Sequence, residues 1–379
     1  MSRTVRPCES PAAGDPPPSS PTSGRPLGII AANEIVPDSR LDGNERPEPG
    51  PGTACLRDWG MIDHRFETVS NGDIDIRVAV AGEGPLMLFV HGWPELWYSW
   101  RHQMEHFADR YTVAAMDVRG YGGSSKPAEI ERYSLRELAS DAAAVIDAMG
   151  GSAIVVGHDW GAPIAWQTAR LHADQVSAVA GLSVPYLPVG PDSPMALWDL
   201  LYADKFFYMK YFQEPGVAEA ELSADCARSL RMVWYSASAD GRGAMIMDKP
   251  ADATMLDGLI DPDPFPAWST PDDLAVYVEA FEAGGWTGPL NRYRAQGVDA
   301  EQLGSQSEPQ KQVLQPSTFI GGEFDPVRNF AAGIDLFGDT GANCADFRGA
   351  TIVPGAGHWV QQEAPEATNA ALDAFVASL

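Results

Sequence analysis

The chain has 379 residues and a formal net charge of −26 at pH 7. This length allows one large domain or two small ones, with enough residues to bury a core. So negative a charge excludes nucleic acid and anionic membrane surfaces as expected partners, because both would repel the protein. No apolar run is long enough to cross a bilayer, and the start has no apolar signal-peptide core, so we predict a cytoplasmic location.

Four cysteines are spread along the chain without a Cys-x-x-Cys pair or a nearby histidine partner: Cys8, Cys55, Cys226 and Cys344. Zinc sites and disulfide frameworks depend on closely and regularly spaced residues, which this spacing does not provide. We therefore predict neither a metal site nor a disulfide framework. The sequence leaves the oligomeric state open between a monomer and a homodimer.

Residues 1–60 differ in composition from the rest of the chain. Eleven of the 31 prolines lie there, among clusters of Ser, Gly and Asp, and no apolar periodicity is sustained. Such a segment cannot bury enough apolar surface to offset the entropy lost on ordering. We predict a disordered, proline-rich extension.

Alternating apolar and polar residues begin near residue 63. The runs 64–69 and 74–80 lie on either side of Asn71-Gly72, which is typical of a β-hairpin. The continuous apolar run 86–90 indicates a central strand that is covered on both faces. The elements expected next are a helix at 97–108, a strand at 111–117, a helix at 135–149, a strand at 153–156 and a strand at 175–182.

Residues 185–300 interrupt this alternation. They are rich in aromatic residues and proline, and we interpret them as an inserted helical lid. Residues 61–184 and 301–379 then form an α/β core, a mostly parallel sheet with helices on both faces. The lid helices are expected at 196–211, 217–238 and 271–283, and the later core elements are strands at 317–320 and 351–353 and a helix at 365–378.

The sequence Gly157-His158-Asp159-Trp160-Gly161 follows an apolar strand and precedes an amphipathic run. This context is typical of a nucleophile elbow, a strained turn in which flanking glycines avoid steric clashes. Asp159 at its tip would place a carboxylate in the active-site cleft. A carboxylate nucleophile forms an ester on the enzyme itself, so its substrate should carry an electrophilic carbon, as an epoxide or an alkyl halide does.

Asp325 and His358 complete the order nucleophile, acid, histidine that α/β hydrolases follow. Each lies just after a predicted strand, so the three side chains should meet at one edge of the sheet. A carboxylate needs no base for its attack, which leaves His358 to deprotonate water in a second step while Asp325 orients its ring. Glu323 is the competing acid; we favour Asp325 because the loop after the strand must extend toward the histidine.

Hydrolysis of an ester on Asp159 passes through a tetrahedral oxyanion, which requires fixed hydrogen-bond donors. The backbone N–H of Trp160, directly after the nucleophile, and that of Trp93 are the predicted pair. His91 and His158 flank the two turns and are expected to orient the backbone rather than to catalyse.

Five ordered motifs carry a resemblance to a known family: His91-Gly92-Trp93-Pro94, Gly120-Tyr121-Gly122-Gly123-Ser124, Gly157-His158-Asp159-Trp160-Gly161, Tyr211-Phe212-Gln213-Glu214-Pro215-Gly216 and Asn291-Arg292-Tyr293-Arg294-Ala295. Over residues 62–379 they resemble the α/β-hydrolase-fold epoxide hydrolases, including the catalytic domain of the mammalian soluble enzyme and its bacterial relatives. The resemblance implies hydrolysis of a small-molecule epoxide by water to a vicinal diol, without a metal or an organic cofactor.

The resemblance also implies two lid tyrosines that hydrogen-bond the epoxide oxygen and protonate it as the ring opens. By motif these are Tyr293 and Tyr208, with Tyr211 as the nearest alternative to Tyr208. Arg292 departs from the family, in which an aromatic residue is expected before the tyrosine, and leaves the pocket wall there unassigned. Further contacts with the substrate are expected from His91, Pro94, Tyr211, Phe212 and Trp359.

Two other functions are compatible with the same fold. A haloalkane or haloacid dehalogenase would use the same aspartate but stabilise a leaving halide through Trp or Asn N–H groups. The lid tyrosines favour the epoxide, and so does Trp93, where haloalkane dehalogenases tend to have Asn. A protein of this fold that only binds ligands would be expected to lack a triad member, and Asp159, Asp325 and His358 are all present.

Overall fold

The computed structural model describes residues 62–242, 244, 248–330 and 334–379. The extension predicted for residues 1–60 lies outside these ranges. No helix in the described part of the chain is long and apolar enough to cross a membrane. Within the same ranges, no group of three or more His, Cys, Asp or Glu residues could hold a metal ion, and Cys226 and Cys344 are free thiols.

Eight strands of the described residues form one sheet with the order β1-β2-β4-β3-β5-β6-β7-β8. The strands are β1 (Arg65–Asn71), β2 (Ile74–Ala81), β3 (Leu86–Val90), β4 (Thr112–Met116), β5 (Ala153–His158), β6 (Val176–Leu182), β7 (Val313–Gly322) and β8 (Cys344–Val353). β2 pairs antiparallel with β1 and β4, and all other neighbours are parallel. The central β3 and β5 are buried along their whole length, as their apolar sequences predict.

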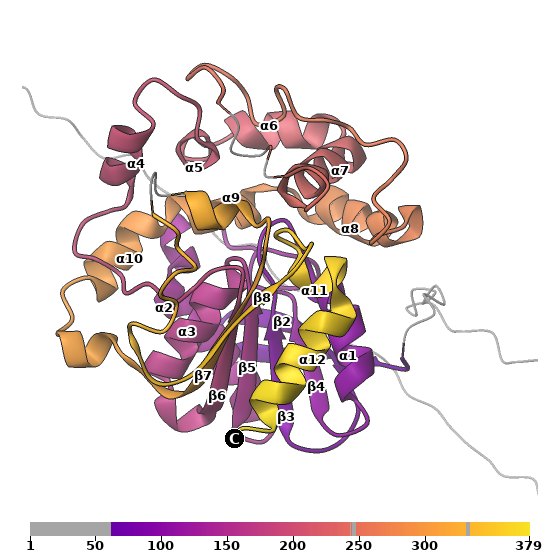
Figure 1. Ribbon diagram of the computed structural model, residues 1–379, viewed down its shortest axis with the longest axis vertical. Coiled ribbons are helices and arrows are strands. Elements are labelled where there is room, and N and C mark those ends of the chain that lie inside the picture. Colours follow the sequence, from indigo (N-terminus) through magenta and orange to yellow (C-terminus); the bar gives the residue numbers. More distant parts are fainter. Residues whose placement is uncertain (1–61, 243, 245–247, 331–333) are drawn as a thin grey trace, which may run out of the picture. The chain divides into compact units, whose positions relative to one another are not determined.

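Helices cover both faces of this sheet (Figure 1). α1 (Arg101–Phe107) packs with α12 (Pro365–Val376), and α2 (Leu135–Ala148) packs with α3 (Gly161–Leu171). α2 begins where predicted because the Ser134 side chain accepts the N–H of Glu137 and caps the first turn. The prediction of a mostly parallel sheet flanked by helices is confirmed.

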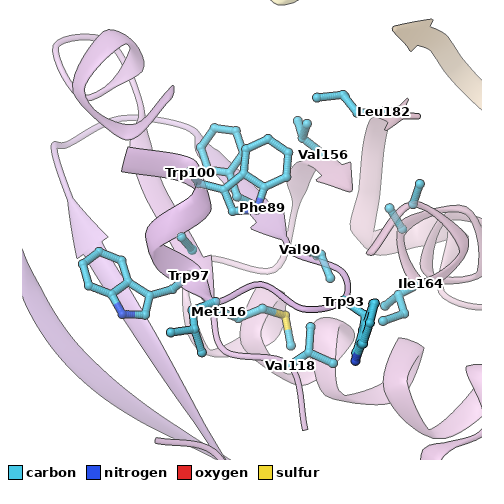
Figure 2. Packing of buried hydrophobic residues seen from close by; sticks show 14 of the residues in the cluster. Phe89, Val90, Trp93, Trp97, Trp100, Met116, Val118, Val156, Ile164 and Leu182 are labelled. Carbon is cyan, nitrogen blue, oxygen red and sulfur yellow. The ribbon is translucent and has the colours of Figure 1, made fainter. Parts of the chain in front are cut away.

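Apolar side chains fill the space around the carboxyl ends of β3 and β5 (Figure 2). Phe89 of β3 stacks on Trp100 with ring centroids 4.9 Å apart, and both side chains are fully buried. Val90 and Val156 belong to the same cluster. Close packing holds interior side chains in fixed positions. The loops that leave these two strands therefore begin from a rigid base.

Seven α-helices of the described residues lie between β6 and β7 in the chain: α4 (Met195–Leu201), α5 (Tyr208–Tyr211), α6 (Val217–Ala224), α7 (Cys226–Ala237), α8 (Pro271–Gly284), α9 (Thr287–Arg294) and α10 (Gln296–Leu303). Figure 1 shows them above the sheet, and α10 extends past the predicted lid boundary at residue 300. This part of the chain has the helical character expected of an inserted lid.

The lid helices correct the prediction in several places. The helix predicted at 196–211 is broken between α4 and α5, because the intervening residues pair with a neighbouring segment: the N–H of Phe206 donates to the carbonyl of Lys249. The helix predicted at 217–238 is interrupted at Asp225, whose side chain caps the first turn of α7. α9 and α10 have no counterpart in the prediction.

Candidate active site

Asp159 lies in the turn between β5 and α3 and has a positive φ of 48°. Left-handed backbone is uncommon for a residue with a side chain and marks local strain. The turn is crowded: a Cβ on Gly157 would lie 2.0 Å from the carbonyl oxygen of Gly161, and one on Gly161 would lie 2.0 Å from that of Val90. The turn therefore has the geometry expected of a nucleophile elbow.

His358 lies between two carboxylates. Its Nε2 is 3.4 Å from Oδ2 of Asp159, and its Nδ1 is 3.0 Å and 3.1 Å from the two carboxylate oxygens of Asp325, which is fully buried. Glu323, the competing acid, is exposed, and its carboxylate accepts the N–H of Gly355 instead. The structure thus brings the three predicted triad residues together and places Glu323 apart from them.

The charges in this triad depend on one another. Burial opposes a charged His358, but the carboxylates of Asp325 and Asp159 raise the pKa of this histidine well above its ordinary value. The two flanking carboxylates therefore favour the protonated form of His358. If Asp159 loses its charge, part of this stabilisation disappears and the pKa of His358 must fall.

The two carboxylate oxygens of Asp159 have different surroundings. Oδ1 accepts the backbone N–H of Trp93 at 2.7 Å, whereas Oδ2 faces His358. Gly92 permits this close approach, because a Cβ there would lie 2.4 Å from Oδ1 and 2.7 Å from the backbone nitrogen of Trp160. Of the two predicted oxyanion donors, the N–H of Trp93 thus bonds one oxygen of the nucleophile, and the backbone nitrogen of Trp160 lies beside Gly92.

Two buried lid tyrosines line the same cavity as the nucleophile. They are Tyr208 of α5 and Tyr293 of α9, whose ring centroids are 5.9 Å apart. Burial and the charge of Asp159 raise the pKa of both phenols well above the ordinary value, so both hydroxyls stay protonated. Tyr211, the alternative, donates its hydroxyl to Glu221 at 2.9 Å and does not line the cavity.

The cavity has a volume of about 20 Å³ and is lined by Trp93, Asp159, Tyr208, Ala237, Tyr293, Pro326, Val327, Phe330, His358 and Trp359. Trp359, predicted as a substrate contact, lines this cavity. His91, Pro94 and Phe212, also predicted as substrate contacts, do not line this cavity. Both ring nitrogens of His91 bond to main-chain groups, and Phe212 packs against the rings of Trp93 and Tyr293.

Glu95 is a fully buried carboxylate that was not predicted from the sequence. It accepts the N–H of Gly92 at 2.9 Å and lies 2.7 Å from Nδ1 of His158, whose Nε2 lies 2.8 Å from the carbonyl oxygen of His358. Because a carbonyl oxygen only accepts, Nε2 of His158 donates to the carbonyl of His358. The pair links the three loops of the site. Its one signal in the sequence is an acidic residue directly after Pro94.

Arg292, which departs from the resembled family, is buried against Trp160. Its guanidinium carbon lies 4.7 Å from the Trp160 ring centre, and the group forms an ion pair with Asp299 of α10. Trp160 and Asp299 also line a second cavity of about 270 Å³ with mostly apolar walls. Beside Tyr293, the guanidinium of Arg292 therefore stacks on the indole of Trp160. The π electrons of the indole attract the cation.

Comparisons with known sequences agree with this geometry. The family model for the alpha/beta hydrolase fold matches residues 85–365. Epoxide hydrolase A of Mycobacterium tuberculosis is 40% identical over 319 residues, which cover 82% of this chain and 97% of that protein. The match therefore includes nearly the whole of a named epoxide hydrolase.

Solved structures give the same result. The structure of an epoxide hydrolase from an endophytic Streptomyces matches with a TM-score of 0.77 and 40% identity, over 83% of this chain and 95% of that one. The crystal structure of epoxide hydrolase A from Mycobacterium thermoresistibile matches with a TM-score of 0.76 and 39% identity, over 83% and 98%. By sequence, by fold and by these relatives, the chain belongs to the epoxide hydrolases of the α/β-hydrolase fold.

Proposed function

We propose that this enzyme hydrolyses epoxides to vicinal diols through an ester on Asp159. The observation that supports this most directly is the meeting of a carboxylate and two protonated phenols around one cavity. The carboxylate can attack a ring carbon while Tyr208 and Tyr293 donate to the ring oxygen. An epoxide presents both atoms at once, because its electrophilic carbon is bonded to its leaving oxygen.

In the first step, Oδ2 of Asp159 attacks a ring carbon and the bond from this carbon to the ring oxygen breaks. The alkoxide that forms takes a proton from Tyr208 or Tyr293, whose raised pKa values keep them protonated until charge appears. Donors fixed in a buried site stabilise such a charge more strongly than water does. His358 stays protonated during this step, because the attack needs no base.

Between the steps, the proton of His358 returns to the tyrosine that lost one. Esterification has removed the negative charge of Asp159, so the imidazolium is less stable and the neutral ring becomes available as a base. The same histidine can therefore be inert in the first step and active in the second.

In the second step, His358 takes a proton from water and the hydroxide adds to the ester carbon of Asp159. The oxyanion forms on Oδ1, which already accepts the N–H of Trp93, and the N–H of Trp160 is the second proposed donor. Cleavage of the bond between this carbon and Oδ2 releases the diol, which takes a proton from the histidine. The new carboxyl group then gives its proton to His358, and the starting ion pair is restored.

Several features favour epoxides over alkyl halides. A leaving halide needs N–H donors but no proton, whereas an alkoxide needs the proton that Tyr208 or Tyr293 can give. The relatives described above are named as epoxide hydrolases. Apolar side chains such as Trp93, Phe330 and Trp359 line the catalytic cavity, which suits a substrate with an apolar substituent. The cytoplasmic location stays a prediction, and the oligomeric state stays open between a monomer and a homodimer.

The test is a panel of styrene-type, aliphatic and fatty-acid epoxides beside a matched series of chloroalkanes. Diols should form from at least one class of epoxide, and Asp159→Ala should abolish their formation. Chloride release without any diol formation would replace the proposal by dehalogenation.

A further inference from the structure

Glu363 ends α11 (Val360–Glu363) and lies partly buried beside the loop that carries His358. Its Oε2 accepts the backbone N–H groups of Gly357 and Ala239, both at 2.9 Å, and its Oε1 accepts that of Trp359 at 2.9 Å. Three main-chain donors from two segments thus bind one carboxylate. Hydrogen bonds to an ionised acceptor are stronger than those between neutral groups.

Two of these donors hold the histidine loop from both sides. Gly357 and Trp359 are the chain neighbours of His358, so their bonds fix the backbone immediately before and after the imidazole. Gly357 also allows a close contact, because a Cβ there would lie 2.3 Å from the backbone nitrogen of Ala239. The orientation of the histidine ring therefore depends on a segment with little freedom to shift.

The third donor connects the histidine loop to lid helix α7. Ala239 lies just after the end of this helix, and the N–H of His358 itself donates to the carbonyl of Ala237 at 3.0 Å. The indole N–H of Trp359 donates to the carbonyl of Trp234, also in α7, at 2.7 Å. The end of α7 and the histidine loop are thus held together by several bonds, with the carboxylate between them.

Only a carboxylate satisfies all three donors. A glutamine offers one acceptor oxygen, and its amide N–H groups would face backbone N–H groups. Burial raises the pKa of Glu363, while the three backbone bonds act in the opposite direction by stabilising its anion. Without the anion, donors beside His358 would be left unpaired, which is costly unless the loop moves.

We propose that Glu363 is a positioning residue for the second step of the reaction. It holds the His358 ring where the ring can activate the water that attacks the ester on Asp159. It also connects the loop of His358 to lid helix α7. Alkylation requires the carboxylate of Asp159 and the lid tyrosines, so it should not depend on Glu363. This inference rests on the proposed function, because it takes His358 as the base for water.

The test measures the two steps separately in single turnovers with the best epoxide of the panel above, by following ester formation and decay with intact-protein mass spectrometry. In Glu363→Gln the ester should form within about 2-fold of the normal rate and decay on the order of 10-fold to 100-fold more slowly, as expected when a catalytic group is slightly displaced. Glu363→Asp, which keeps the charge, should recover part of the decay rate. Equal slowing of both steps, or normal decay, would overturn the proposal.

Two further variants keep the test decisive. Glu366→Gln changes an exposed glutamate in the first turn of α12 and should leave both steps unchanged. If Glu363→Gln does not fold, Ala239→Pro removes only the donor on the lid side, and the extended backbone of Ser238 accepts a following proline. Ester decay should then slow several-fold, and an unchanged rate would contradict the tie to the lid.

His358→Gln separates this inference from the proposed function. If the ester accumulates in His358→Gln while it decays normally in Glu363→Gln, the positioning role alone is wrong. If neither variant accumulates an ester, the two-step reaction itself is wrong.

Discussion

Nε2 of His358 and Oδ2 of Asp159 lie 3.4 Å apart, so the nucleophile of the proposed first step and the base of the second form an ion pair. The carboxylates beside His358 favour its protonated form, which cannot accept a proton during the first step. Esterification ends the pair. The histidine then becomes a base because its partner has lost its charge.

Asp159→Asn should lower the pKa of His358 from its raised value, because a neutral amide no longer stabilises the imidazolium. A titration followed by NMR would measure this shift. The raised pKa also stabilises the fold: this contribution is complete below the ordinary histidine pKa and is lost as the pH rises through the raised value. The variant should therefore lose part of this pH dependence of the free energy of unfolding. Glu323→Gln is the control, and an unchanged His358 pKa in Asp159→Asn would rule out the electrostatic coupling.

With enzyme in excess over epoxide in heavy-oxygen water, the first diol should contain no heavy oxygen. Its new oxygen atom should be Oδ2 of Asp159, which passes to the product when the ester carbon is attacked. Mass spectrometry of the diol measures this directly. Full labelling of that first diol would mean that water attacks the epoxide and that no ester forms.

Tyr208→Phe and Tyr293→Phe should each slow alkylation, because a proton donor in such a site contributes on the order of 10²-fold to 10⁴-fold. With two phenols around one oxygen, either variant keeps a donor, so each single effect should be moderate and the double variant nearly inactive. Tryptophan fluorescence in pre-steady-state mixing would follow the alkylation rate. Tyr211→Phe is the control, since its hydroxyl bonds Glu221. If Tyr208→Phe left the alkylation rate unchanged and Tyr211→Phe lowered it, Tyr211 rather than Tyr208 would be the second proton donor.

Arg292→Met should destabilise the fold by about 3 kcal/mol, because removing one partner of a buried ion pair leaves the carboxylate of Asp299 unpaired. Chemical denaturation would measure the change. Adding Asp299→Asn should restore much of the loss, since the amide oxygen can still accept the N–H of Leu135. Arg136→Met, at an exposed position, should change stability by less than about 0.5 kcal/mol. Equal effects at both arginines would contradict the importance of the buried pair.

The catalytic positions were predictable because each follows a strand that could be recognised, at least in part, in the sequence. The carboxyl ends of parallel strands meet at one edge of a sheet, so Asp159, Asp325 and His358 had to lie near one another once the strands were identified. The choice of Asp325 over Glu323 also agrees with the geometry, since only the buried carboxylate reaches the imidazole.

Other features depend on contacts that local patterns do not encode. The break between α4 and α5 follows from pairing with residues near Lys249, and the burial of Glu95 follows from the approach of His158. β8 is much longer than the strand predicted at 351–353, because an edge strand with polar residues such as Arg348 lacks the apolar pattern of a central strand.

The hydrogen bond from the N–H of Trp93 to Oδ1 distinguishes the two carboxylate oxygens of Asp159 from one catalytic cycle to the next. In the proposed cycle Oδ2 leaves with every diol and is replaced by an oxygen from water, so this atom is consumed and renewed while Oδ1 is retained. If this bond prevents the carboxylate group from rotating and exchanging its two oxygens, many cycles in heavy-oxygen water should leave Asp159 with one heavy oxygen. A carboxylate that rotates freely between cycles would acquire two heavy oxygens. The isotopic composition of a single side chain would then record how firmly its backbone donor holds it.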